Sequence, residues 1–100
     1  MKIIIKEKLL DTPRNLIRRC GYAEISNREG EISYTKRLGR DHYPRLHAYI
    51  EEYVIGFAIN LHLDMKQASY EGFHAHSGEY EGPMLDKESE RIKSIIMNPV

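Results

Sequence analysis

Cysteine is almost missing from this chain of 100 residues, in which Cys20 is the only one. A single cysteine cannot close an internal disulfide, and it cannot build a metal site made of several thiolates. The composition therefore favours a reducing compartment, and we expect a cytoplasmic protein. Any bound metal would have to be held by histidine and carboxylate side chains.

Long apolar runs are missing as well. No stretch approaches the roughly 20 apolar residues that a membrane-spanning helix needs. The N-terminal segment contains three consecutive isoleucines, but Lys6 and Glu7 interrupt it, so that it predicts a strand rather than a signal peptide. Because repeats and linkers rich in proline, glycine or serine are also absent from the sequence, we expect a single domain over residues 1–100.

The chain has no net charge, yet its charges are unevenly distributed. Residues 1–50 carry eleven Lys and Arg against six Asp and Glu, whereas residues 51–100 carry four against nine. Such asymmetry is typical of a basic surface for phosphate or nucleic acid, or of complementary faces that associate. The plainer interpretation is that both sets solvate the surface and pair weakly across it.

The pattern of apolar residues predicts the order of helices and strands. Residues 2–9 should form a strand and residues 13–20 a short helix, which a capping side chain and Pro13 begin and Gly21 ends. A period of two then predicts strands near 22–26, 31–38, 45–52 and 54–64, and a helical period returns after Pro83. This order, β-α-β-β-β(β)-α, predicts an α+β two-layer sandwich, in which an antiparallel meander sheet carries two helices on one face.

Alternation within the strands assigns side chains to the two faces of this sheet. The face under the helices should take the apolar residues, including Phe57, Ile59, Leu61 and Leu63 of one strand and Ile32, Tyr34 and Leu38 of another. The opposite, open face should then carry Arg37, Arg45, His47, Tyr49, Asn60, His62 and Asp64. The segment 65–83 is too long for a tight connection, and we expect an ordered loop over an edge or the open face of the sheet.

Histidines cluster in the middle of the chain, where four of the five lie between positions 47 and 76. His62 and Asp64 are two residues apart, as are His74 and His76, so each pair can point one way from an extended backbone. Imidazole and carboxylate without thiolate suit Zn, Fe or Mn. The leading hypothesis is a small metal-binding protein, and its more specific form is a metal-dependent hydrolase. Its candidate metal ligands are His62, Asp64, His74 and His76, and its candidate catalytic residues are Glu79 and His47.

Other functions stay open on the same residues. The histidines could act as a metal-free general base beside an aspartate, or could serve only as structural hydrogen-bond partners. Arg37, Arg45 and Tyr49 could instead bind an anion, RNA or another polyanion without catalysis. A third hypothesis is a structural or interaction protein, a homodimer for example, in which the oppositely charged halves drive self-association.

One long motif carries a resemblance. It comprises Leu61–Asp64, Ser69–Gly72 and His74–Gly82, with further similarity around Arg18–Tyr22 and Arg37–Gly39. In these residues the chain is similar to a group of short bacterial proteins to which no activity is attached. The resemblance implies a shared fold and no mechanism.

Overall fold

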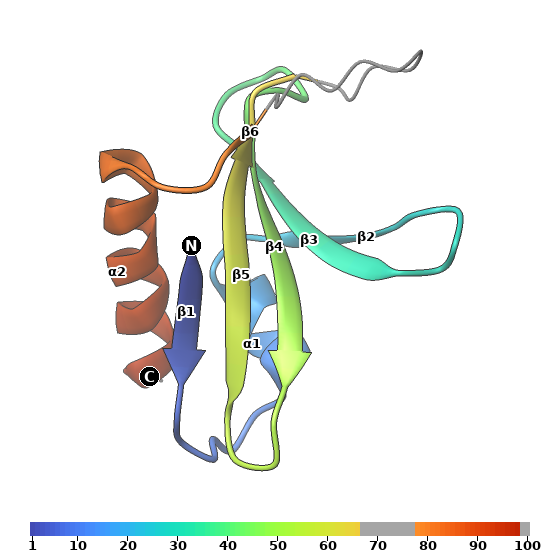
Figure 1. Cartoon of the computed structure of the whole chain (residues 1–100). Coiled ribbons are helices and arrows are strands. Elements are labelled where there is room, and N and C mark those ends of the chain that lie inside the picture. Colours follow the sequence, from blue (N-terminus) through green and yellow to red (C-terminus); the bar gives the residue numbers. More distant parts are fainter. Residues whose placement is uncertain (67–77, 99–100) are drawn as a thin grey trace.

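The computed structural model describes residues 1–66 and 78–98. Within them the strands form one antiparallel sheet in the spatial order β1-β5-β4-β3-β2, and a short sixth strand, β6, also pairs with β5. Both helices pack on one face of this sheet (Figure 1). The predicted α+β two-layer arrangement is confirmed. The elements are β1 (Lys2–Ile5), α1 (Pro13–Arg19), β2 (Ala23–Ser26), β3 (Ile32–Arg37), β4 (Arg45–Glu52), β5 (Phe57–Asp64), β6 (Gly78–Glu79) and α2 (Pro83–Met97).

The local signals explain where the first helix begins and ends. Thr12 caps α1, because its Oγ1 accepts a hydrogen bond of 3.2 Å from the backbone N–H of Asn15, and Pro13 occupies the first turn, where no intrahelical donor is needed. Gly21 follows with a φ of 95°, a conformation that glycine adopts without strain. The helix therefore ends where the sequence predicts.

The core lies between the helices and one face of the sheet. Leu16 and Ile17 of α1 and Ile92 of α2 are almost completely buried against Ile3 and Ile59 of the strands. Burying one such side chain contributes about 1.5–3 kcal/mol. This packing fixes which face of the sheet is covered, and it leaves the opposite face without a helix.

Two residues predicted for the core are exposed, namely Ile32 at 53% and Leu38 at 41%, whereas Tyr34 between them is buried. Figure 1 shows that the β2–β3 hairpin extends beyond the two helices, so the far end of β3 has no apolar layer to cover it. Leu38 follows the last residue of β3. The prediction that Ile32 and Leu38 are buried was therefore wrong. Alternation indicates the sheet face to which a side chain points, but it does not indicate how much of that face the helices cover.

A buried polar cluster ties the helix layer together. The Tyr22 hydroxyl donates to Glu88 Oε2 over 2.6 Å, and Arg91 donates to both oxygens of Glu88 over 2.7 and 2.9 Å. Arg91 also donates to the backbone oxygen of Cys20 over 2.6 Å. Burial alone would raise the pKa of Glu88, but the hydrogen bonds from Arg91 and Tyr22 outweigh it and lower that pKa. The cluster therefore joins the end of α1 to α2 through an ionised carboxylate.

Ion pairs link the basic and acidic halves of the chain across the sheet. Lys2 Nζ lies 3.3 Å from Glu51 Oε1, and Arg45 Nε lies 3.2 Å from Asp64 Oδ2. Opposite charges from the two halves thus pair within one chain, as the plainer interpretation of the charge asymmetry expects. Self-association stays a prediction. In the described part of the chain, neither helix combines the length and the apolar character that crossing a membrane requires.

Candidate metal centre on the open sheet face

The two central strands bring three chemically active side chains together. In the antiparallel register of β4 and β5, His47 lies opposite His62 and Arg45 lies opposite Asp64. Residues directly opposite each other share a face of the sheet. The neighbours Leu46 and Leu63 are buried under the helices, so the two histidines and Asp64 lie on the open face.

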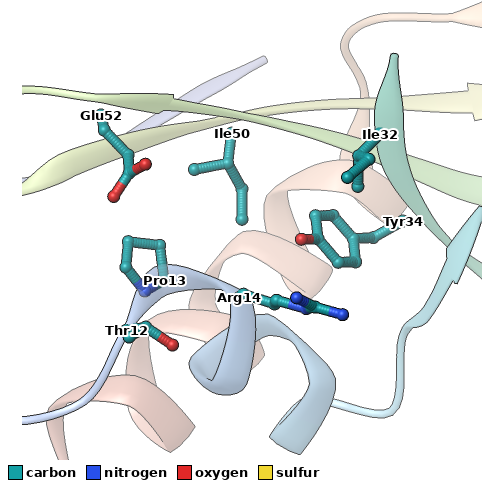
Figure 2. A pocket seen from close by; sticks show the side chains of 7 residues that line it. All are labelled: Thr12, Pro13, Arg14, Ile32, Tyr34, Ile50 and Glu52. Carbon is teal, nitrogen blue, oxygen red and sulfur yellow. The ribbon is translucent and has the colours of Figure 1, made fainter. Parts of the chain in front are cut away.

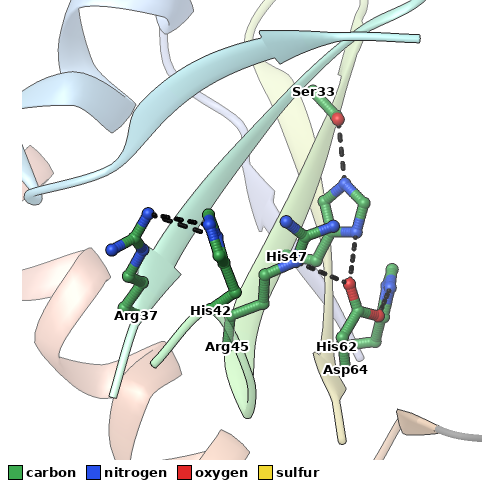
Figure 3. A network of polar contacts seen from close by, with 7 residues as sticks. All are labelled: Ser33, Arg37, His42, Arg45, His47, His62 and Asp64. Carbon is green, nitrogen blue, oxygen red and sulfur yellow. Dashed lines mark hydrogen bonds and ion pairs between the residues drawn. The ribbon is translucent and has the colours of Figure 1, made fainter. Parts of the chain in front are cut away.

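Asp64 is the centre of the resulting hydrogen-bond network, which Figure 3 shows. Its Oδ2 lies 2.9 Å from His47 Nδ1 and 3.2 Å from Arg45 Nε, and its Oδ1 lies 2.8 Å from His62 Nε2. Burial would raise the pKa of Asp64, but the hydrogen bonds from His47, His62 and Arg45 outweigh it and hold that pKa well below its usual range. Asp64 is therefore an ionised carboxylate with both oxygens engaged.

Ser33 on β3 orients the ring of His47. The Ser33 Oγ lies 2.8 Å from His47 Nε2, and both side chains are buried. The order Ser33–His47–Asp64 resembles the hydrogen-bond chain of serine hydrolases. However, Ser33 lies near the start of β3, where its backbone pairs with Ile25 of β2, and its side chain is 6% exposed. We therefore interpret Ser33 as the partner that fixes the imidazole and directs Nδ1 at Asp64.

Aromatic rings surround the histidines. The ring of Tyr49 lies 4.6 Å from that of His47 and 5.9 Å from that of His62, measured between centroids, and the ring of Tyr80 lies 5.2 Å from that of His62. Tyr80 follows β6, which pairs with the end of β5. The described end of the segment 65–83 thus lies along the β5 edge, and the rings restrict the orientation of His62.

These positions could hold a metal ion. One ligand atom from each of His47, His62 and Asp64 can be chosen so that all lie within 4.8 Å of one another. Two imidazoles and one carboxylate are a donor set for Zn or Fe, and three protein ligands leave coordination positions for water or substrate. Arg45 bonds one carboxylate oxygen from outside, as the outer partners of metal ligands commonly do.

The residues predicted for the site are placed in different ways. The structure brings His62 and Asp64 together and adds His47, which the sequence indicated as catalytic rather than as a ligand. His74 and His76 lie outside the described residues, so their role as ligands stays a prediction. Glu79 pairs with Leu63 across β5 and β6. Its side chain is exposed and belongs to the face opposite Asp64, so the described geometry does not direct it at the cluster.

Two of the predicted anion-binding residues meet in one groove. A cavity of about 600 Å³ opens along β2, β3 and β4, and Arg37 and Arg45 line it together with Lys36 and His42. Tyr49 does not line this groove; its ring stacks on that of His62 and is tilted against that of His47. Because Arg45 also bonds Asp64, its side chain connects the groove to the three-residue cluster.

A further cavity, of about 380 Å³, lies on the helix side of the sheet, where the start of α1 faces β3 and β4 (Figure 2). Arg14 in its wall is ion-paired with Glu24, with Nε and Oε1 2.7 Å apart. Glu52 is the carboxylate among its described lining residues, and no histidine is among them. This cavity therefore offers no donor set for a metal, and it is separated from His47 by the sheet.

Comparisons with known proteins do not add a relative, since no family model, no curated protein and no solved structure matches the chain. The resemblance to the group of short bacterial proteins stays a prediction. The function of the chain must accordingly be argued from its geometry.

Proposed function

We propose that this chain is a small metal-binding protein in which His47, His62 and Asp64 hold one divalent transition-metal ion, and that the bound ion serves hydrolysis. The observation that carries the proposal is the convergence of two imidazoles and an ionised carboxylate within 4.8 Å on an open sheet face. Zn, Fe and Mn all accept this donor set. A hydrolase is favoured because three protein ligands leave room for a metal-bound water.

The surroundings of the three residues support a metal rather than a purely structural role. Ser33 holds one ring nitrogen of His47, which leaves the other directed at the carboxylate. Metal-bound histidines commonly have such a partner on the second nitrogen. The protein itself would orient the three ligands, keep Asp64 ionised and keep other hydrogen-bond partners away from the ligand atoms. A metal ion bound there would lower the pKa of a coordinated water towards neutrality.

Elemental analysis and calorimetry of the untagged protein test the proposal. We expect about one Zn, Fe or Mn per chain, or uptake of one after treatment with a chelator. The variants H62N and D64N should weaken metal binding at least about 100-fold, whereas H42N, which removes an exposed histidine outside the cluster, should bind metal as the unchanged chain does. Absence of metal together with absence of uptake would overturn the proposal.

Hydrolysis requires its own measurement. The metal-loaded protein should cleave a chromogenic phosphate or carboxylate ester, and D64N or a chelator should abolish the activity. Metal binding without turnover of any such ester would leave the metal site standing and contradict the hydrolytic role.

A further inference from the structure

The groove beside the metal cluster concentrates positive charge. Lys36, Arg37 and Arg45 line it with His42, and no Asp or Glu is among its described lining residues. The positive electrostatic field of these side chains would attract an anion. A concave site focuses this field more than a flat surface does. The lining thus favours an anionic ligand.

The donors in the groove are available for a ligand. Arg37 contacts His42, with Nη2 and Nδ1 3.2 Å apart, and within residues 1–66 and 78–98 it has no carboxylate partner. Arg45 uses Nε for Asp64, and its guanidinium carbon lies 4.6 Å above the ring of Tyr43. The stacking on Tyr43 and the bond to Asp64 hold the guanidinium in place, and its two Nη groups form no hydrogen bond to any described residue. Two arginine forks on neighbouring strands suit a tetrahedral oxyanion.

Arg45 connects this groove to the metal cluster. One end of its side chain lines the groove and its Nε bonds the Oδ2 of Asp64, a proposed metal ligand. An anion held beside Arg45 would therefore be next to the proposed metal rather than at a remote surface, and Figure 3 shows His42 between Arg45 and Arg37. In a solvated basic turn the cations point freely into water. Here, in contrast, the guanidinium of Arg45 is fixed by its bond to Asp64.

We infer that the groove is a phosphate-binding site and that the substrate class of the proposed hydrolase is a small phosphate monoester. The size of the groove, about 600 Å³, fits a small ligand. The zero net charge of the chain and its pI near 7.0 argue against a long polyanion, because domains that bind nucleic acid are typically basic. Phosphate binding itself needs no metal. The assignment of that phosphate to a substrate rests on the proposed metal centre.

The test measures binding of inorganic phosphate and of phenyl phosphate to metal-free protein by NMR titration. We expect shifts confined to β3, β4 and the residues between them, and a dissociation constant at least about tenfold higher in R37Q than in the unchanged chain. The matched control is R40Q. Arg40 is an exposed arginine in the connection between β3 and β4, and it does not line the groove. R40Q should bind phosphate as the unchanged chain does. Because Arg37 is exposed, R37Q should fold, and its spectrum checks this.

The outcomes separate the two proposals. Equal phosphate affinity in R37Q and R40Q, or no binding at all, would overturn the phosphate site whatever the metal measurements give. Phosphate binding that depends on Arg37 in a chain that takes up no metal would keep the site and remove its substrate role. Much tighter binding of a single-stranded RNA, with affinity falling steeply as salt rises, would show a polyanion ligand and overturn the small-phosphate assignment.

Discussion

Glu88 on α2 and Asp64 on β5 are both partly buried carboxylates whose pKa is lowered by several hydrogen bonds. Their partners differ. Glu88 is held by Arg91, whose guanidinium coordinates no metal, and by Tyr22, whose hydroxyl stays protonated because burial raises its pKa. Asp64 is held chiefly by two histidines, whose nitrogens can exchange a hydrogen bond for a metal ion.

The position of each network in the fold differs as well. The Glu88 network joins elements 66 residues apart in sequence, between two helices and the sheet. The Asp64 network lies on neighbouring strands that the backbone ladder already joins. The first network therefore joins distant parts of the fold, whereas the second lies on a sheet face that no helix covers, where we propose that the metal binds.

Removal of Glu88 should have the largest effect on stability. E88A leaves the buried hydroxyl of Tyr22 without its partner and leaves Arg91 with only the backbone oxygen of Cys20, so the free energy of unfolding should fall by about 3 kcal/mol. Urea denaturation measures this. The control E90A, an exposed residue of the same helix, should change stability by about 0.5 kcal/mol or less. Equal effects of E88A and E90A would contradict the structural role of the cluster.

Removal of the Asp64 charge should have a large effect on metal binding and a small effect on stability. D64N should weaken metal binding at least about 100-fold, because a ligand is lost and its outer partners are released. The free energy of unfolding of the metal-free chain should change by only about 1 kcal/mol. Calorimetric titration with Zn and urea denaturation of the same sample measure both. A D64N chain that binds metal normally but unfolds easily would place Asp64 in the same class as Glu88.

Ser33 should have a smaller effect on the metal site. S33A keeps the three ligands but releases the His47 ring, and we expect an affinity about tenfold lower at unchanged stoichiometry. The control is T35A, because Thr35 lies opposite His47 on β3 and has no side-chain hydrogen bond to the described residues. Identical titration curves for S33A and T35A would remove the positioning role of Ser33.

Acid should weaken the Glu88 network gradually. The pKa of Glu88 is lower in the folded chain than its ordinary value of 4.5, so the unfolded chain binds more protons in the acid range. The stabilisation is therefore fully present above about pH 5 and is lost as the pH falls through the folded-state pKa. Urea denaturation at several acidic pH values should show a shallower decline for E88Q. An E88Q curve parallel to that of the unchanged chain would contradict this origin.

Local patterns in the sequence were sufficient for the layers of the fold. The capping Thr12 with Pro13 located the first helix, and alternation in β5 separated the buried Ile59 from His62. These features depend on neighbours within a few residues, so they can be read without knowledge of the partner strands. The reach of the helices over Ile32 could not be read in this way, because it depends on packing between distant segments.

The candidate site was partly predictable for the same reason. His62 and Asp64 stand out because they are two apart on one strand, whereas the pairing of His47 with His62 needs the register between two strands. Ser33 gave no signal, since a serine on a polar strand face is common. The described geometry places His47, predicted as a catalytic residue, among the candidate ligands, adds Ser33, and leaves His74 and His76 as predictions.

The tight turn between β4 and β5 sets the register on which this arrangement depends. Gly56 has a φ of 84°, and its backbone oxygen accepts a hydrogen bond of 3.1 Å from Tyr53 N–H. A Cβ at Gly56 would overlap the backbone oxygen of Ile5 on β1. Because side chains alternate between faces, a slip of β5 by one residue would turn His62 and Asp64 toward the helices. A glycine at the far end of the hairpin thus helps to keep His62 and Asp64 on the same face as His47, although it touches none of the three.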